Sequence, residues 1–113
     1  MKEGDVVLIS LPQANGQRKR RPAIVLRSLP PFGDFLICGV SSQLRQEAKG
    51  FDELIVNSDT DFFKSGLRAD SLIRLGFLAI YTRAQLLGSI GEISVDRHNR
   101  LVKRLADFLV KGN

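Results

Sequence analysis

The sequence predicts a mainly β domain that ends in one α-helix. Short apolar runs separated by turn residues fill the chain as far as Ser94, and apolar residues recur with helical spacing only after it. Regular turns between short strands are typical of a small all-β unit, so we expect an SH3-like barrel whose open side the helix covers. A length of 113 residues suits one compact core, and we expect a single domain over residues 1–113.

About six stretches have the apolar, β-branched character of strands. Pro22 cannot donate to a strand ladder, so it marks the entrance of the second strand, and PPFG at 30–33 marks the turn after it. The polar segment 57–66 separates two later strands. The expected strands are residues 5–11, 23–29, 35–42, 52–56, 71–81 and 87–94.

The C-terminal segment has the signals of an amphipathic helix. Ser94 is a suitable N-cap, and Asp96 lies in the first turn, where the helix dipole favours an acidic residue. Lys111 and Gly112 suit the C-terminal end. The apolar residues with helical spacing are Val95, Leu101, Val102, Leu105, Phe108 and Leu109.

The composition is that of a folded, basic protein. Apolar residues make up 43% and charged residues 26%, and the net charge is +5 with a pI of about 9.9. A surplus of this sign favours polyanionic partners such as nucleic acid, an anionic membrane or an acidic protein segment. No apolar run approaches the roughly 18 residues that span a bilayer, and no secretory leader is recognisable at the N-terminus. Cys38 is the only cysteine, so we expect a cytoplasmic protein without an internal disulfide and without a membrane partner.

Conventional catalytic sets are missing from the sequence. His98 is the only histidine, and one histidine with one cysteine does not supply the ligands of a usual zinc site. We expect His98 to face solvent on the C-terminal helix, between Arg97 and Asn99. Phosphate-binding glycine loops and nucleophile elbows are also missing, so the expected site uses neither a metal nor another cofactor.

A basic run, RKRR, stands directly before Pro22 and the second apolar strand. Arginine holds its charge and presents a planar fork of donors that matches phosphate oxygens. We expect the first three residues of the run, Arg18, Lys19 and Arg20, to attract a polyanion. Arg21 is held rigid by the proline and is expected to act on the bound phosphate. A plain solvated loop is the alternative that composition alone leaves open.

A second feature is the sequence CGVSSQ, in which a buried strand ends in Ser41 and Ser42, followed by Gln43. Serines at a strand end usually form turns, but their hydroxyls also donate hydrogen bonds to phosphate. Cys38 in the same strand has apolar neighbours and no basic partner, so we expect a buried, inert thiol rather than a nucleophile.

Several blocks occur in an order that resembles one protein family. They are GDVVLISLP, RRPAIVL after a loop with glycine and glutamine, ICGVSSQ, SGLRADSLIRL and LLGSIGEIS. The ordered set is similar to the MazF/PemK toxins of bacterial type II toxin–antitoxin modules and covers nearly the whole chain. The resemblance implies the MazF/PemK/CcdB-type toxin fold, a homodimer, and metal-independent, sequence-selective cleavage of single-stranded RNA, often mRNA. It also implies a cognate antitoxin whose extended acidic C-terminal segment blocks the RNA groove.

The resemblance assigns roles to individual residues. The family's arginine before proline matches Arg21, and its threonine or serine at the end of the third strand matches Ser41. In the family these residues assist attack of the RNA 2′-hydroxyl on the adjacent phosphate, which leaves a 2′,3′-cyclic phosphate and a 5′-hydroxyl. The expected residues for binding RNA or antitoxin are Gln17, Arg18, Lys19, Arg20, Ser42 and Gln43.

The sequence departs from the family pattern in several places. Gly16 stands where many members have a glutamate or histidine in the first loop. Ala79 and Ile80 stand where many have an Arg-Thr pair, and Thr82 where many have an aspartate. Two alternatives stay open: a gyrase poison of the CcdB type, which usually has a tryptophan near the C-terminus that this chain lacks, and a degenerate toxin that binds RNA or antitoxin without cleavage.

The segment LIRLGFLAIY at 72–81 contains more apolar side chains than one face of a small barrel needs. We expect some of them to meet the partner subunit of the homodimer, so that two copies of the basic run share one surface. The residues concerned are Leu75, Phe77, Leu78, Ile80 and Tyr81. The alternative is that they fill the core of the monomer.

Overall fold

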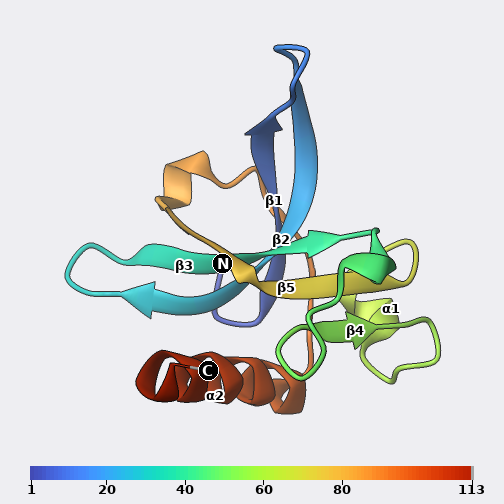
Figure 1. Ribbon diagram of the computed structural model, residues 1–113. Helices are drawn as coiled ribbons and strands as arrows, with labels where there is room; N and C mark the ends of the chain where they lie inside the picture. Colours follow the sequence, from blue (N-terminus) through green and yellow to red (C-terminus); the bar gives the residue numbers. More distant parts are fainter. Residues whose placement is uncertain (113) are drawn as a thin grey trace.

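The computed structural model describes residues 1–112 as a curled antiparallel sheet and a long C-terminal helix (Figure 1). The strands are β1 (Asp5–Pro12), β2 (Arg18–Leu29), β3 (Asp34–Ser41), β4 (Glu53–Ile55), β5 (Ser71–Tyr81) and β6 (Ser89–Glu92). The helices are α1 (Phe62–Ser65) and α2 (Val95–Lys111), and short 3-10 turns occupy Leu44–Gln46 and Arg83–Gln85. The strand order is β4-β5-β3-β2-β1-β6, and the sheet curls into a half-barrel. This confirms the expected mainly β fold with a C-terminal helix.

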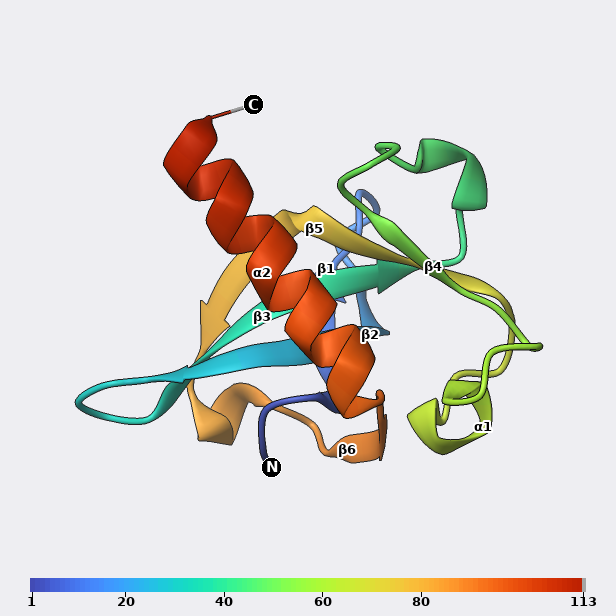
Figure 2. The same cartoon turned by 90° about the horizontal axis from the view of Figure 1, so that it is seen from below.

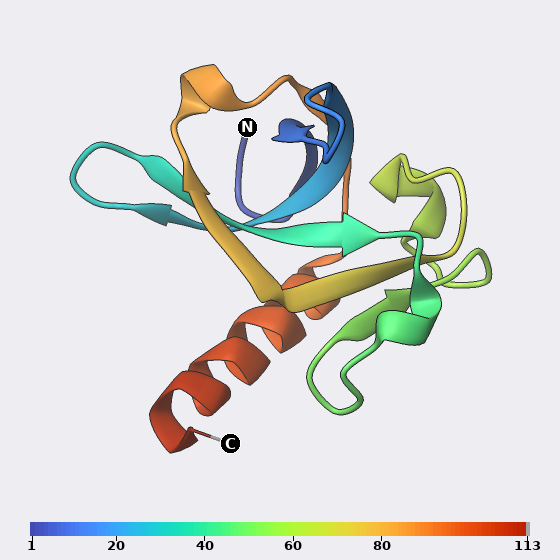
Figure 3. The ribbon, with the colours of Figure 1, turned by 45° about the horizontal axis from the view of Figure 1, so that its top comes forward.

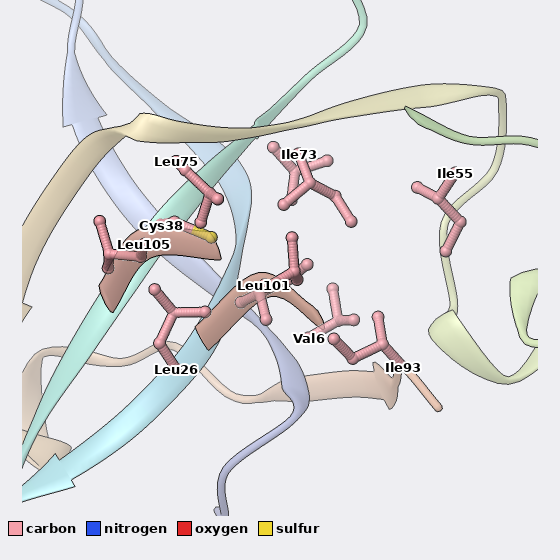
Figure 4. Close-up of a cluster of buried hydrophobic side chains, with 11 residues drawn as sticks. Val6, Leu26, Cys38, Ile55, Ile73, Leu75, Ile93, Leu101 and Leu105 are labelled. Atoms are coloured by element: carbon pink, nitrogen blue, oxygen red, sulfur yellow. The ribbon is translucent and has the colours of Figure 1, made fainter. Parts of the chain in front are cut away.

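The sheet has a core on each of its sides. In β2, Leu26 packs in the core beside α2, and Val25 packs in the core inside the curl, because successive side chains of a strand point to opposite faces. Figure 4 shows the first core, where Leu101 and Leu105 of α2 pack with residues of the sheet. The second core consists of Val7, Ile9, Ala23, Val25, Phe35, Ile37 and Leu86. Burial on both sides explains why the central strands are apolar almost throughout.

The ends of α2 are those that the sequence predicts. Ser94 Oγ accepts a hydrogen bond from the backbone N–H of Arg97 (3.1 Å). Gly112 closes the helix in the left-handed conformation with φ of 72°, and its N–H donates to the carbonyl of Phe108 (2.7 Å). The boundaries of α2 are therefore set by local capping chemistry.

The expected apolar face of α2 packs on the sheet only in part. Leu101 and Leu105 are buried, whereas Leu109 is 68% exposed. The last turns of the helix extend past the sheet, as Figures 2 and 3 show. None of the helices formed by residues 1–112 is long and apolar enough to cross a membrane.

The start of β2 differs from the expectation. The strand begins at Arg18, so the basic run belongs to a β-hairpin, and Pro22 lies inside the ladder opposite Leu8 rather than at the strand's entrance. The ladder tolerates proline here because Leu8 turns both backbone groups to the other side. Its N–H donates to the carbonyl of Gly88 (2.9 Å), and its carbonyl accepts from the N–H of Leu87 (2.9 Å). A proline opposite Leu8 therefore removes no hydrogen bond to β1.

The polar segment 57–66, expected as a plain connection, contains α1 and ends in a close contact with β6. Gly66 has φ of 74°, and a Cβ at this position would lie 2.1 Å from the carbonyl oxygen of Ile90. Only glycine fits both the backbone conformation and the approach. This contact holds the following segment, 67–69, near the β1–β2 hairpin, where it contributes to the site described below.

Candidate functional site

Strands β2 and β3 bring Arg21 and Ser41 to the same end of the sheet. The antiparallel register pairs Ala23 with Gly39. Arg21 precedes Ala23 by two residues and Ser41 follows Gly39 by two, so both lie on the same side of this pair. Both residues line one surface hollow together with Pro22. The structure thus brings together the two residues that the resemblance singles out.

Two hollows meet at these residues and form one groove. They share Arg21, Pro22, Val40, Ser41 and Ser42. The smaller hollow has a volume of about 160 Å³ and is completed by Ile9, Leu11, Gly39, Gln43, Arg74 and Phe77. The larger has a volume of about 540 Å³ and is completed by Leu8, Arg20, Gly66, Leu67, Arg68, Ala69, Ser71 and Ile90. We call the two together the Arg21 groove; it lies between the β1–β2 hairpin and the C-terminal end of β3.

The structure divides the expected binding residues into two sets. Arg20, Ser42 and Gln43 line the Arg21 groove with Arg21 and Ser41. Gln17, Arg18 and Lys19 line neither hollow and lie exposed at the end of the hairpin. Arg18 folds back on β1, where its Nε donates to Ser10 Oγ (2.8 Å) and its Nη2 to the carbonyl of Ser10 (2.9 Å). The basic run therefore does not act as a single loop, because its first two residues lie at the exposed end of the hairpin and only Arg20 and Arg21 lie far enough along β2 to line the groove.

The expected site residues leave out two arginines and one aromatic residue that line the groove. Arg74 lies in β5 opposite Gly39, and a lone arginine within the apolar run SLIRLG is the signal that indicates it. Arg68 reaches the groove from the segment between α1 and β5. Phe77 reaches it through an irregular register of β5, which no sequence pattern displays.

The Arg21 groove carries positive charge that the chain itself does not neutralise. Arg20, Arg21, Arg68 and Arg74 line it, and no Asp or Glu among the described residues does so. Within residues 1–112, the arginines that form ion pairs all lie elsewhere: Arg27, Arg97, Arg100 and Arg104. The groove therefore offers guanidinium donors to an external anion.

The hydroxyl of Ser41 is held in a defined orientation. Its Oγ accepts a hydrogen bond from the backbone N–H of Gln43 (3.0 Å). A serine hydroxyl has one proton to donate besides its lone pairs, so the Oγ–H of Ser41 stays available for an anion in the groove.

His98 and Cys38 lie outside the Arg21 groove. The expectation that His98 faces solvent is wrong: its ring is half-buried, and Nε2 lies 2.8 Å from the carbonyl oxygen of Leu26, which accepts a hydrogen bond from it because α2 packs on β2. Cys38 is fully buried, as expected, and burial raises the pKa of its thiol to about 12. Among residues 1–112, no three His, Cys, Asp or Glu side chains are grouped so as to hold a metal ion.

Comparison with known families decides the class of the protein. The model of the family described as PemK-like, MazF-like toxin of type II toxin-antitoxin system matches residues 2–109. The chain belongs to this family. The resemblance drawn from the sequence blocks is confirmed, and the half-barrel with its C-terminal helix is consistent with the MazF/PemK fold. The protein is thus a type II toxin with an antitoxin as its partner. A comparison with curated protein sequences finds no match.

The structure also shows where the residues lie at which we expect a departure from the family pattern. Ala79 and Ile80, at the positions where we expect the family's Arg-Thr pair, pair with Ile37 and Leu36 of β3 and do not line the Arg21 groove. Arg74, earlier on the same strand, does line it. The groove therefore contains a guanidinium of β5 at Arg74, and positions 79 and 80 contribute nothing to its lining.

Proposed function

We propose that this toxin is an endoribonuclease that cleaves single-stranded RNA without a metal ion and leaves 2′,3′-cyclic phosphate and 5′-hydroxyl ends. The observation that carries the proposal is the joint placement of Arg21 and Ser41 in a groove whose arginines have no partner among the described residues. Family membership supports it, because endoribonuclease activity is typical of these toxins.

The proposed chemistry uses a nucleophile that belongs to the substrate. The 2′-hydroxyl of the RNA loses its proton to water and attacks the adjacent phosphorus, the bond to the 5′ oxygen breaks, and the departing oxygen takes a proton from water and leaves as a hydroxyl. The protein positions these atoms and stabilises the charge that develops on the phosphate oxygens. The fork of Arg21 donates to one non-bridging oxygen of the phosphate, and the Ser41 hydroxyl, oriented by Gln43, donates to the other. Because arginine and serine dominate the polar lining, charge stabilisation rather than a strong general base is the protein's contribution.

The same groove is the proposed site of antitoxin inhibition. An antitoxin is the partner that the family implies. An acidic C-terminal segment would complement the charges of Arg20, Arg21, Arg68 and Arg74 and compete with RNA for them. The inhibitor and the substrate thus share one electrostatic requirement.

A homodimer is the proposed assembly, with the two grooves on one surface. Leu75 does not contribute to the interface, because it is fully buried in the monomer's core. Leu78 and Ile80, by contrast, are 40% and 62% exposed on β5 and are the proposed contacts to a partner subunit. Light scattering at micromolar concentration tests this; a monomer mass throughout would remove the shared surface.

The decisive experiment incubates the pure toxin with a long single-stranded RNA in the presence of a chelator. Arg21→Ala is expected to lower the cleavage rate by roughly 10²–10³-fold, the usual effect of removing one donor that stabilises a developing anion. Arg27→Ala is the matched control, because Arg27 lies on the same strand and pairs with Glu3 away from the groove. End labelling then identifies the chemical nature of the new termini.

The outcomes separate the proposal from its alternatives. Equal cleavage by the wild-type and Arg21→Ala proteins would remove Arg21 from the mechanism. Strong, salt-dependent RNA binding without turnover would indicate a degenerate toxin. Inhibition of gyrase supercoiling without RNA cleavage would indicate a poison of the CcdB type.

A further inference from the structure

An irregular stretch of β5 shapes one end of the Arg21 groove. Cys38 of β3 pairs with Leu78, but the next residue, Gly39, pairs with Arg74, so the β5 residues between these two partners have no counterpart in β3. β5 bends sharply along its length, as Figure 3 shows. The irregular register brings both Arg74 and Phe77 to the small hollow that Gly39 lines.

The ring of Phe77 occupies the space that a side chain at Gly39 would need. A Cβ added at Gly39 would lie 3.0 Å from Cδ1 and 3.1 Å from Cγ of Phe77. Glycine therefore permits the ring to approach the β3 backbone closely. Phe77 is only half-buried, so the ring packs against β3 and is also open to the hollow.

The hollow beside Phe77 combines apolar walls with a polar rim. Its walls include Ile9, Leu11 and Pro22. Its rim consists of Arg21, Ser41, Ser42, Gln43 and Arg74. We propose that this hollow is a nucleobase subsite in which one base of a single-stranded RNA stacks on the ring of Phe77, an inference that rests on the proposed RNA substrate.

The neighbouring groups fit a nucleotide better than an acidic peptide. A nucleotide joins a flat ring to a phosphate. Phe77, Arg21 and Ser41 line the same small hollow, so an aromatic surface and phosphate-binding groups lie together in it. The side-chain amide of Gln43 offers both a donor and an acceptor, as a base edge requires, whereas a carboxylate requires donors alone. Aromatic side chains are a common surface on which proteins stack unpaired bases.

The test measures binding separately from cleavage. The probe is a short single-stranded oligonucleotide of 2′-deoxynucleotides, which lacks the 2′-hydroxyl nucleophile and so stays intact. Phe77→Ala is expected to weaken its binding roughly 5- to 100-fold, the usual loss for one stacked base. Phe77→Trp keeps an aromatic surface and is expected to bind within a few-fold of the wild type. Phe32→Ala is the matched control, since Phe32 is 87% exposed in the turn at the other end of β3.

Two further measurements locate the base. Oligonucleotides with 5-iodouracil at one position at a time are irradiated on the wild-type protein, and a crosslink to Phe77 is expected from a single position. Gly39→Ala keeps Phe77 but requires its ring to shift by a few tenths of an ångström, so it is expected to weaken oligonucleotide binding in the same direction as Phe77→Ala and by less. Thermal unfolding of each variant shows whether the fold is kept, and Gly39→Ala together with Phe77→Trp keeps the test decisive if Phe77→Ala does not fold.

The outcomes distinguish this inference from the proposed nuclease activity. If the wild type cleaves RNA but Phe77→Ala binds and cleaves the same sequences equally well, the nucleobase subsite is overturned and the nuclease stands. If the wild type cleaves nothing yet binds the deoxyoligonucleotide in a Phe77-dependent way, the subsite stands and the nuclease falls. If Phe77→Ala weakens an acidic peptide but not the oligonucleotide, the hollow belongs to the antitoxin and the subsite is overturned. A wild type that binds no oligonucleotide also overturns the subsite, whereas the nuclease stands or falls with RNA cleavage alone.

Discussion

Arg97 and Arg21 are the same residue type in opposite situations. Arg97 is 5% exposed at the start of α2 and donates to both carboxylate oxygens of Asp61 (2.8 and 3.0 Å), to Glu53 (2.8 Å) and to Asp59 (3.0 Å). These hydrogen bonds tie the helix to β4 and to the segment around α1. Arg21 lines an open groove and has no ion-pair partner among residues 1–112.

The difference shows how one side chain serves either stability or binding. A buried guanidinium without its partners would be left uncompensated, so Arg97 must be satisfied within the chain. A guanidinium that binds a ligand must keep its donors free, so Arg21, like Arg20, Arg68 and Arg74, lies where solvent and anions reach it. Substitutions of the two kinds of arginine, and of the acid that faces Arg97, test this division.

Arg97→Met is expected to lower the free energy of unfolding by about 3–5 kcal/mol, because it leaves the buried Asp61 without its ion-pair partner and removes one of the three arginines that pair with Glu53. Denaturant unfolding measures this value. The matched control is Arg27→Met, which breaks an exposed pair with Glu3 and should cost less than about 1 kcal/mol. Equal losses in the two variants would mean that the Arg97 cluster is no more important than a surface ion pair.

Arg21→Ala is expected to behave in the opposite way. Its free energy of unfolding should stay within about 0.5 kcal/mol of the wild type. RNA binding by this variant should depend less on salt than binding by the wild type. The slope of the log association constant against log salt concentration should be reduced by roughly 0.7 for each phosphate that the protein no longer neutralises. Filter binding over a salt series measures the slope, and Arg74→Ala should repeat the result. A folding defect in Arg21→Ala as large as that of Arg97→Met would assign Arg21 a structural role instead.

Acid should loosen the Arg97 cluster through Asp61. Burial alone would raise the pKa of Asp61, but hydrogen bonds from Arg97 and Ser94 and the charge of Arg97 outweigh it and hold the value at about 2. Because the folded pKa lies below the ordinary value near 4, this stabilisation is complete above pH 4 and is lost as the pH falls toward 2. We expect a loss of about 2 kcal/mol across this window, measured by unfolding at each pH. Asp61→Asn should flatten that part of the profile, and an unchanged profile would contradict the assignment.

Arg18→Ala is expected to have the smallest effect. Its guanidinium is bound to Ser10 on the exposed hairpin and does not line the Arg21 groove. We expect a stability change below about 1 kcal/mol and cleavage within a few-fold of the wild type. Cleavage reduced as far as in Arg21→Ala would show that the hairpin end is part of the active surface.

The succession of strands along the chain, the ends of α2 and the family could all be predicted from the sequence. Apolar runs between turns indicate strands because a strand buried on both sides excludes polar residues. Ser94 and Gly112 mark the helix ends because capping depends on the residues next to the helix. Arg21 and Ser41 were identified through resemblance, and the pairing of two adjacent strands was enough to bring them together.

The ion-pair partners of Arg97 and the full set of groove residues could not be predicted from the sequence, because both depend on how distant segments of the chain pack. Arg97 meets Asp61 and Glu53, which are 36 and 44 positions away in the sequence, and no local pattern specifies partners at that distance. Phe77 reaches Gly39 because the β3–β5 register shifts, and Pro22 fits inside a ladder because Leu8 bonds to the other side. Charge and apolar character are properties of a residue, but a register or an ion pair depends on where a distant segment of the chain packs.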